Sequence, residues 1–478
     1  MKNARRILGI VALAALVFGG ARLAGWIAQR RAVVTVQRQL IQDVAQLDGH
    51  AYYDFQLLDA NTPGERLVDS DDPDIDRHPL AGLCGEDWFH DIVYVTFAQV
   101  DGVPEDRRVT VRGEIGDAQI LPLLQLPHLQ WLAVSGTAIS DAAVAQIARQ
   151  SSLQRLWLSR TQIGDPALNS LLQCPTLTHL ALEGTPTSDV GLTSLSQLPS
   201  LRFLSLGSPY VTADGLRRLG QTRTLEELHL DRLPVDAAVT KQLAQLTQLR
   251  VLSLRMTPLT DEAMAALHPL QLLQEVHLDG TLLGDAALAT AAQWKQLKIL
   301  SVAYTSITDV GLQELAACTQ LQRLDVKQTS VSLAGLHKLF VQQQQRTWTD
   351  GLQCVFTTRA SEAGQLISLD LSPVRLSDSD VGYLLPLTEL QWLTMSNSRL
   401  TDAGIQTLLQ ADWKQLSLLR LDNADISDVS LERLAQLPAL RTLHIANTHV
   451  SPAAVAKLTA RKPGLRVYTE QFADKKLK

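Results

Sequence analysis

Residues 297–307 read Leu-Lys-Ile-Leu-Ser-Val-Ala-Tyr-Thr-Ser-Ile, which is one copy of a pattern that returns every 24 residues. Aliphatic residues hold its first, fourth, sixth and eleventh positions, and threonine holds the ninth. A fixed period of this length predicts a stacked repeat. The leading leucine lies at Leu129, Leu153, Leu177, Leu201, Leu225, Leu249, Leu273, Leu297 and Leu321, and, after an interruption, at Leu366, Leu390, Leu416 and Leu440. We therefore expect thirteen rungs, nine and then four.

The local structure of each rung can be predicted from its sequence. The alternating segment predicts a short strand with its leucines turned inward and the residues between them turned outward. The hydroxyl at the ninth position is expected to hydrogen-bond the turn that leaves the strand, with Ser398 in place of threonine in one rung. A hydroxyl residue followed by aspartate then predicts a helix start. These starts lie at Ser140, Ser188, Thr260, Thr308, Ser377, Thr401 and Ser427.

This pattern resembles the leucine-rich-repeat superfamily, in its T-D-x-G-L class, which is similar to the cysteine-containing repeats of F-box proteins. The segments Thr308–Leu312 and Thr401–Ile405 carry the resemblance, and Cys174 and Cys318 match its cysteine position. The resemblance covers residues 129–468. It implies an α/β solenoid with a curved parallel sheet inside and short helices outside. No F-box is apparent, so a ubiquitin-ligase role is not carried over.

The N-terminal segment, residues 1–31, is expected to meet a membrane. An apolar run follows Lys2, Arg5 and Arg6, and counted from Ile7 to Ala28 it is long enough for a single transmembrane helix. A cleaved signal peptide remains the alternative, with Gly19-Gly20-Ala21 as the cleavage site. In either case we expect the repeats on the extracytoplasmic side.

Residues 32–108 are expected to form an α+β cap that includes an acidic loop at 69–76. This region resembles that of bacterial membrane-anchored leucine-rich-repeat proteins. Strands are expected at 92–97 and 109–111, where they would close the exposed end of the first rung. Residues 109–339 then form the first repeat block, residues 340–365 a terminal-type rung and loop, and residues 366–478 the second block with its C-terminal cap.

Composition excludes some classes of function. The net charge is −6, which gives no electrostatic reason to expect a nucleic-acid partner. Cys174 and Cys318 are six repeats apart and too distant to pair, so we interpret both as buried thiols. No nucleophile, phosphate-binding or metalloprotease motif occurs in the sequence. We therefore expect no cofactor, no metal and no enzymatic activity.

Candidate site residues follow from the outward positions of the strands. Large aromatic residues on a strand surface are the usual anchors of a binding interface. The candidates on the concave face are Trp131, Trp157, His179, Phe203, His229, Asp231, His277, Asp279, Tyr304 and Trp392. The sequence favours a membrane-tethered scaffold that binds a protein partner through this face. The alternatives are that the aromatic residues only shield one another, and that the protein is a purely structural component of the cell envelope.

A further alternative makes the His229/Asp231 and His277/Asp279 pairs a metal or ligand site of an enzyme. The two pairs are two rungs apart, which is about 10 Å. Ligands of one zinc ion each lie about 2.1 Å from it. Hydrogen-bonded ladders between histidine and acidic side chains, within and across rungs, are therefore the favoured interpretation.

Overall fold

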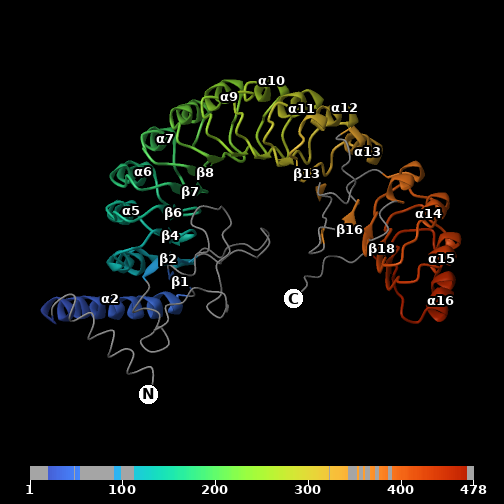
Figure 1. Cartoon of the computed structure of the whole chain (residues 1–478), viewed down its shortest axis with the longest axis horizontal. Coiled ribbons are helices and arrows are strands. Elements are labelled where there is room, and N and C mark those ends of the chain that lie inside the picture. The colour runs from blue at the N-terminus through green and yellow to red at the C-terminus, as the bar shows by residue number, and fades with distance from the viewer. Residues whose placement is uncertain are drawn as a thin grey trace, which may run out of the picture. The chain divides into compact units, whose positions relative to one another are not determined.

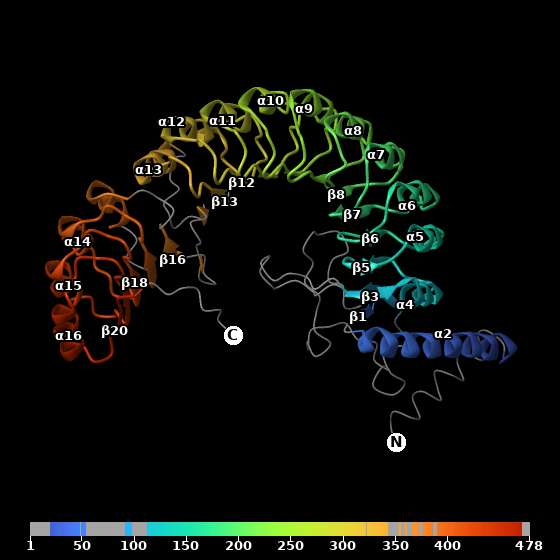
Figure 2. The same cartoon turned by 180° about the vertical axis from the view of Figure 1, so that it is seen from behind.

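The computed structural model describes residues 20–47, 49–53, 91–97, 112–321, 323–342, 353–354, 359–360, 366–371, 376–385 and 390–470. The chain divides into two compact units, Met1–Val211 and Thr212–Lys478. In each unit, parallel strands form an inner layer and short helices form an outer layer (Figures 1 and 2). The leucine-rich-repeat architecture expected from the sequence is therefore confirmed.

Unit 1 contains one main sheet, in which β1 pairs antiparallel with β2 and the following strands are parallel. Its strands, in spatial order, are β1 (His50–Tyr53), β2 (Ile92–Thr96), β4 (Trp131–Ala133), β6 (Arg155–Trp157), β7 (His179–Glu183) and β8 (Phe203–Gly207). A short pair, β3 (Arg112–Gly116) and β5 (Thr137–Ala138), lies outside this sheet. The outer helices are α4 (Asp117–Ile120), η3 (Leu121–Gln125), α5 (Asp141–Ile147), α6 (Asp165–Ser170), η4 (Leu171–Gln173) and α7 (Asp189–Leu195).

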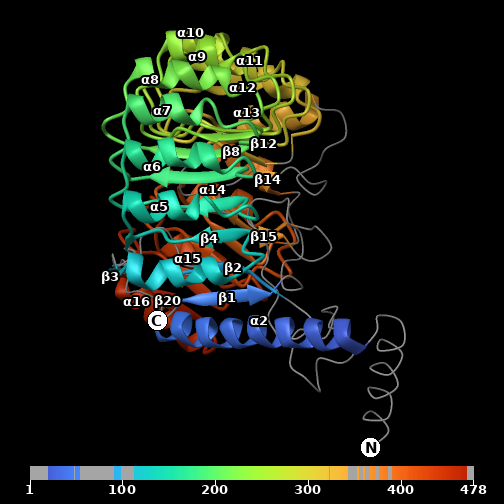
Figure 3. The same ribbon diagram turned by 90° about the vertical axis from the view of Figure 1, so that its left-hand side faces the viewer.

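The N-terminal end of unit 1 is closed by α2 (Gly20–Gln46), which runs alongside β1 (Figure 3). One face of α2 is buried through Val34, Gln37, Leu40 and Val44. Asp91, just before β2, accepts hydrogen bonds from Arg30 at 2.5 Å and from Gln37 at 3.3 Å. The expected strand at 92–97 is present and pairs with the first rung. The expected strand at 109–111 and the acidic loop at 69–76 lie outside the described residues.

Unit 2 contains two sheets. The first consists of β9 (Glu227–His229), β10 (Val251–Ser253), β11 (Glu275–His277), β12 (Ile299–Ser301), β13 (Arg323–Asp325) and β14 (Gln353–Cys354). The second consists of β15 (Arg359–Ala360), β16 (Leu366–Asp370), β17 (Trp392–Thr394), β18 (Leu418–Arg420), β19 (Thr442–His444) and β20 (Arg466–Tyr468). Because β14 pairs with β13 and β15 pairs antiparallel with β16, the sheet changes within the predicted interruption at 340–365.

The outer layer of unit 2 begins with α8 (Ala213–Arg218), η5 (Leu219–Gln221), α9 (Ala237–Leu243), α10 (Asp261–Ala265), α11 (Asp285–Ala291), α12 (Asp309–Leu312), η6 (Gln313–Ala317) and α13 (Leu333–Gln342). It continues with η7 (Asp378–Leu384), α14 (Asp402–Leu408), α15 (Asp428–Leu434) and α16 (Pro452–Arg461).

The 24-residue period sets the strand register. Leu132 pairs with Leu156 and Leu156 with Leu180, and all three leucines are fully buried. Cys174 and Cys318 are buried free thiols, as expected. Burial raises the pKa of both, that of Cys318 to about 11. The register of these leucines shows that the core is built from the same repeat position of successive rungs, stacked on one another.

The predicted turn and cap hydrogen bonds are mostly present. Thr305 Oγ1 donates to the carbonyl of Val302 at 2.6 Å, and seven other threonines repeat this contact. Ser398 was expected to make it and does not, because its buried Oγ has no partner among the described residues. Serine lacks the γ-methyl group that restricts χ1 in threonine. Ser377 also differs from the other helix starts, because its hydroxyl donates to Asp380.

The aspartate that opens most helices has a role that the sequence did not indicate. Its carboxylate accepts hydrogen bonds from the cap residue of the next rung, as Asp285 does from Thr308 N and Oγ1, both at 2.7 Å. We call this series the acid ladder. Its acceptors are Asp117, Asp141, Asp165, Asp261, Asp285, Asp309, Asp378, Asp402 and Asp428. Alanine replaces this aspartate at Ala213 and Ala237, the first residues of α8 and α9.

The expected membrane segment is only partly covered by the structure. Within the described residues, no helix is both long enough and apolar enough to cross a membrane. Residues 7–19 of the predicted segment lie outside them.

Candidate binding surfaces on the inner sheet

Unit 1 carries a row of aromatic side chains on the outward positions of its sheet, which we call the aromatic ladder. Register brings Tyr52 beside Tyr94, and Tyr94 beside Trp131. Their ring centroids are 5.1 Å and 3.8 Å apart, and both pairs are stacked. Trp157 continues the ladder 4.4 Å from Trp131, and Phe203 lies 6.4 Å from Trp157. The rings thus form one connected row from β1 to β8, in which Tyr94 is buried and Trp131, Trp157 and Phe203 are partly exposed.

Trp157 reaches its neighbours because the adjacent positions are small. Its register partners on β4 and β7 are Ala133 and Ala181, and both are buried. A bulky residue at either position would occupy the space that the indole covers. The two alanines therefore let Trp157 pack against Trp131 and Phe203.

A cation and a neutral imidazole lie within the ladder. Arg155 is 7% exposed, and its guanidinium carbon lies 5.2 Å from the centroid of the Trp131 ring, a cation–π arrangement. The His179 ring stacks on Phe203 at 5.6 Å. Burial, and then the charges of Arg155 and Arg202, lower the pKa of His179 to about 4. His179 is therefore uncharged at neutral pH.

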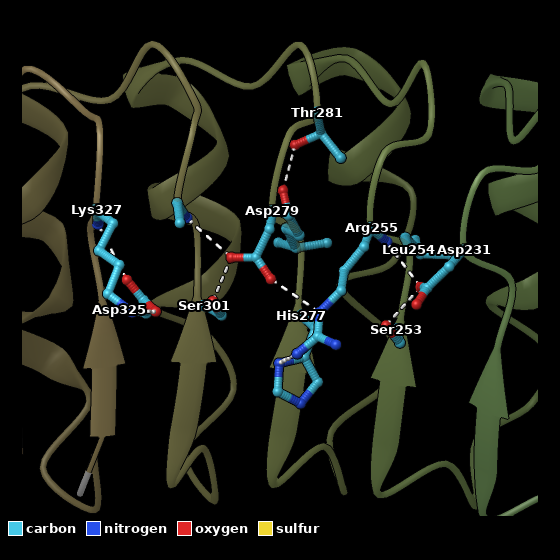
Figure 4. Close-up of polar contacts among 12 residues, drawn as sticks. Asp231, Ser253, Leu254, Arg255, His277, Asp279, Thr281, Ser301, Asp325 and Lys327 are labelled. Carbon is cyan, nitrogen blue, oxygen red and sulfur yellow. Dashed lines mark hydrogen bonds and ion pairs between the residues drawn. The ribbon is translucent and has the colours of Figure 1, made fainter. Parts of the chain in front are cut away.

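The first sheet of unit 2 carries polar contacts between its rungs instead (Figure 4). Asp231 accepts hydrogen bonds from Ser253 Oγ at 2.6 Å and from the Arg255 backbone N–H at 2.9 Å. Asp279 repeats this arrangement with Ser301 and Ala303, and it also pairs with Arg255 at 2.9 Å. The aspartates therefore join consecutive rungs.

The two histidines pair with glutamates on their own strands. His229 Nε2 lies 2.7 Å from Glu227, and His277 Nε2 lies 2.7 Å from Glu275. Neither of these bonds involves the aspartate two residues further on. In register, Ser253 separates His229 from His277. Of the expected ladders, the bonds from histidine to an acid are present within a strand, with glutamate, while the bonds across rungs join aspartate to serine, arginine or backbone N–H. No cluster suited to a metal ion occurs among the described residues.

The proton position on His277 follows from its contacts. Arg255 Nη2, which can only donate, lies 2.9 Å from His277 Nδ1. Nδ1 is therefore the acceptor, and Nε2 carries the proton that is donated to Glu275. This hydrogen bond from His277 is the main cause that lowers the pKa of Glu275.

The two remaining candidates lie apart from these groups. Tyr304 lies in the turn after β12, with φ 56°, and is 65% exposed. Trp392 lies on β17 in the second sheet of unit 2, in register with Leu418. The ten predicted residues thus form an aromatic group in unit 1, a polar group in unit 2 and two separate positions.

Sequence reasoning missed two rings of the aromatic ladder, Tyr52 and Tyr94, and the arginine that packs on it, Arg155. The two tyrosines lie in the cap region, where no repeat marks which residues face outward. Arg155 could have been found from the sequence. It lies two residues before Trp157 in a predicted strand, so both side chains are on the outward face and Leu156 between them points inward.

No family model and no curated protein matches the chain. Among solved structures, it is similar to an internalin from Listeria monocytogenes, with 19% identity over 73% of this chain and 82% of that chain, and a TM-score of 0.41. A leucine-rich-repeat protein of Leptospira interrogans is 19% identical over 73% of this chain and 98% of that chain, with a TM-score of 0.45. A TDR receptor is 13% identical over 74% of this chain and 70% of that chain, also with a TM-score of 0.45.

Proposed function

We propose that this chain is a non-catalytic, protein-binding repeat protein whose contact surface is the aromatic ladder of unit 1. The observation that carries the proposal is the placement of the rings. The leucines of the same strands fill the core, whereas Trp131, Trp157 and Phe203 stay partly exposed next to the buried Tyr94. Clustered aromatic residues with an adjacent arginine are typical of the energetic centre of a protein interface.

The packing of the rings favours a protein partner over a sugar. Tyr94 and Trp157 come from the strands on either side of Trp131, so both faces of its indole are covered. A sugar ring would stack on an open face, whereas the side chains of a protein can pack against ring edges. Mutual stacking also restricts the rings before binding, which lowers the entropy lost on association.

The inner face of unit 2 supports the same assignment by contrast. Its aspartates and histidines are committed to bonds between rungs or within strands. Breaking these bonds to engage a partner would leave half-buried charges without their acceptors or donors. A partner can contact the aromatic ladder without breaking hydrogen bonds or ion pairs of this kind.

Cross-linking in intact cells tests this proposal. A photoreactive amino acid at Phe203 should trap a protein partner that mass spectrometry identifies, and the same probe at exposed Val310 on α12 should not trap it. Replacing Trp131 and Trp157 with Ala should abolish the product. Trp392→Ala, which removes an aromatic residue in unit 2, is the matched control. A product that persists in the double variant, with its melting curve showing folded protein, would overturn the proposal.

We also propose that residues 7–28 tether the protein to a membrane, with the repeats on the extracytoplasmic side. Two features of α2 support this. The described part of α2, from Gly20, includes the end of the apolar run, and its Trp26 is 54% exposed, as suits an interfacial aromatic residue. The tether predicts that the full-length chain resists alkaline extraction from membranes and that external protease reaches the repeats. Release by alkali would refute it.

A further inference from the structure

We propose that the C-terminal end of the second sheet of unit 2 is a self-association surface, at which β20 of one copy pairs antiparallel with β20 of a second copy. Among the described residues, β20 is the last strand of that sheet and α16 is the last helix of the outer layer (Figure 2). We call the outer side of these two elements the end face. It is separate from the aromatic ladder and does not depend on the function proposed above.

The end face leaves two core positions partly open. Val455 on α16 and Val467 on β20 are partly exposed. The residues at the same positions one rung earlier, Leu431 and Leu443, are 1% and 0% exposed. Each repeat buries its core against the next one, so a terminal repeat needs either a polar outer side or a cover. Two valines do not provide a polar side, so this end needs a cover.

The backbone of β20 has an open edge. Arg466 N donates to the carbonyl of Arg441 at 2.8 Å, and the carbonyl of Tyr468 accepts from Ile445 N at 2.9 Å. Successive residues of a strand direct their backbone groups to opposite edges, so the N–H and carbonyl of Val467 point away from β19. No strand of the described part of the chain lies on that side. The edge is therefore able to pair with another strand.

The edge is complementary to itself when two copies are antiparallel. A two-fold axis at Val467, perpendicular to the sheet, brings the Val467 residues of the two copies side by side, where each N–H donates to the other carbonyl. The same axis brings Arg466 opposite Tyr468 of the second copy, a cation beside an aromatic ring. The α16 helices then run side by side on the same face of the joined sheet and cover Val455. The result is a closed, isologous pair.

Arg466 and Glu470 give the end face charge complementarity. Neither side chain forms a hydrogen bond or an ion pair within its own chain. Both lie on the outward side of β20, because side chains alternate along a strand. In the antiparallel register, Glu470 of one copy is the diagonal neighbour of Arg466 of the other, within reach of the guanidinium. Turning toward this glutamate also takes each arginine away from its own symmetry mate.

Glu470 occupies a position at which acids of earlier rungs accept hydrogen bonds from the rung that follows. Asp422, two rungs earlier, accepts from Ala446 N at 2.8 Å. Asp231 and Asp279 accept from the following rung in the first sheet. No further rung follows Glu470 among the described residues, so a second copy can supply the donor that the next rung supplies elsewhere.

Sedimentation velocity of the full-length chain over a concentration series tests the proposal. The wild type should self-associate. Arg466→Glu and Glu470→Arg should each weaken the association by about tenfold or more, because each removes the opposite charge from both ion pairs. The chain that carries both substitutions should regain most of it, because the pairs are restored with reversed sign. Arg399→Glu, at an exposed arginine three rungs from the end face, is the control.

A monomeric wild type would overturn the proposal, and so would a double variant that associates no better than the single ones. The chain that ends at Glu470 tests the other occupant, which is this chain's own residues 471–478. If that shortened chain associates while the full-length chain is monomeric, the chain's own terminus covers the end face and a second copy does not.

Proline at Val467 tests the strand pairing. Val467→Pro should abolish the association, because proline lacks the N–H that faces the second copy. This N–H serves no bond to β19, so the variant should stay folded, as its melting curve will show. Val467→Ala is the matched control, because it also removes the valine side chain but keeps the N–H. Equal association of the two variants would contradict the pairing of β20 with β20.

Disulfide trapping tests the orientation in a background in which Cys84 and Cys354 are serine. A mixture of Arg466→Cys and Tyr468→Cys chains should cross-link, because residues opposed in a non-hydrogen-bonded antiparallel pair have Cα atoms about 4.5 Å apart. Arg466→Cys alone should cross-link much more slowly. Rapid self-linking of Arg466→Cys would mean that the strands are parallel and would contradict the two-fold pair.

Discussion

The carboxylate of Asp285 receives both the backbone N–H and the hydroxyl of Thr308, which opens the helix of the next rung. Gly311 lies directly over this carboxylate. A Cβ built there would be 2.5 Å from Asp285 Oδ1 and 2.7 Å from its Cα. The glycine of this T-D-x-G-L segment therefore provides space for an acid of the preceding rung.

Gly311→Ala should destabilise unit 2 by about 1–3 kcal/mol, because the backbone of Asp285 cannot move away from the new methyl group. Denaturant unfolding measures the change. Gly382→Ala is the control, because a Cβ there meets nothing within 4 Å. It should be neutral or slightly stabilising. Equal effects of the two substitutions would contradict the close packing of Gly311 on Asp285.

Trp294 and Trp413 hold equivalent positions three residues before a repeat leucine, and both are buried. Trp413 Nε1 donates to the carbonyl of Leu408 at 2.7 Å, whereas Trp294 Nε1 has no partner in the described part of the chain. Substitution by Phe removes similar volume from both sites. Trp413→Phe should cost about 1–2 kcal/mol more than Trp294→Phe, since only the former breaks a hydrogen bond. Denaturant unfolding measures both changes in the free energy of unfolding. A larger destabilisation by Trp294→Phe than by Trp413→Phe would contradict the prediction.

Acid should weaken unit 1 through His179. Its pKa is about 4 in the folded chain, below the ordinary value of about 6.5 that applies when the chain is unfolded. As pH falls from about 6.5 to about 4, the unfolded state binds a proton that the folded state does not, so stability is lost in that window. The loss is at most about 3 kcal/mol. His179→Asn should flatten the dependence of the melting temperature on pH, and an unchanged slope would contradict this.

Nuclear magnetic resonance can determine which imidazole nitrogen of His277 carries the proton. We expect the proton of the ring on Nε2, since Arg255 donates to Nδ1. Nitrogen shifts of the imidazole should show an unprotonated Nδ1. Arg255→Gln should remove this constraint and the ion pair with Asp279, and His229 on β9, two strands away, serves as an internal reference. A proton on Nδ1 in the wild type would refute the assignment.

Much of the fold was predictable because the repeat places each side chain relative to its neighbours. Leu156 and Leu180 occupy the same position 24 residues apart, so inward burial at one implies it at the other. Thr305 shows that local turn contacts were predictable too. Ser398 shows where such prediction fails. Its hydroxyl could form the turn hydrogen bond, but the sequence does not determine the direction in which the hydroxyl points.

The features that were not predicted depend on contacts between rungs. The bond from Thr308 to Asp285 requires the stacking offset of two helices, which no single rung reveals. The aromatic surface likewise extends into Tyr94, which belongs to no repeat, and Trp157 joins it because Ala133 and Ala181 are small. Outward direction could be assigned from the sequence, but the partner of each outward side chain could not.

The gap in the acid ladder also has a mechanical consequence. Ala213 and Ala237 replace the aspartates that would fasten α8 to α9 and α9 to α10. Asp236 has become the cap residue of α9, where it accepts from Val239 N instead of from the next rung. Within the first sheet of unit 2, a force applied along the stack of rungs should therefore separate α8, α9 and α10 before neighbouring rungs that keep this aspartate. Each rung contacts only its neighbours, so no other contact replaces a hydrogen bond that is missing between two rungs.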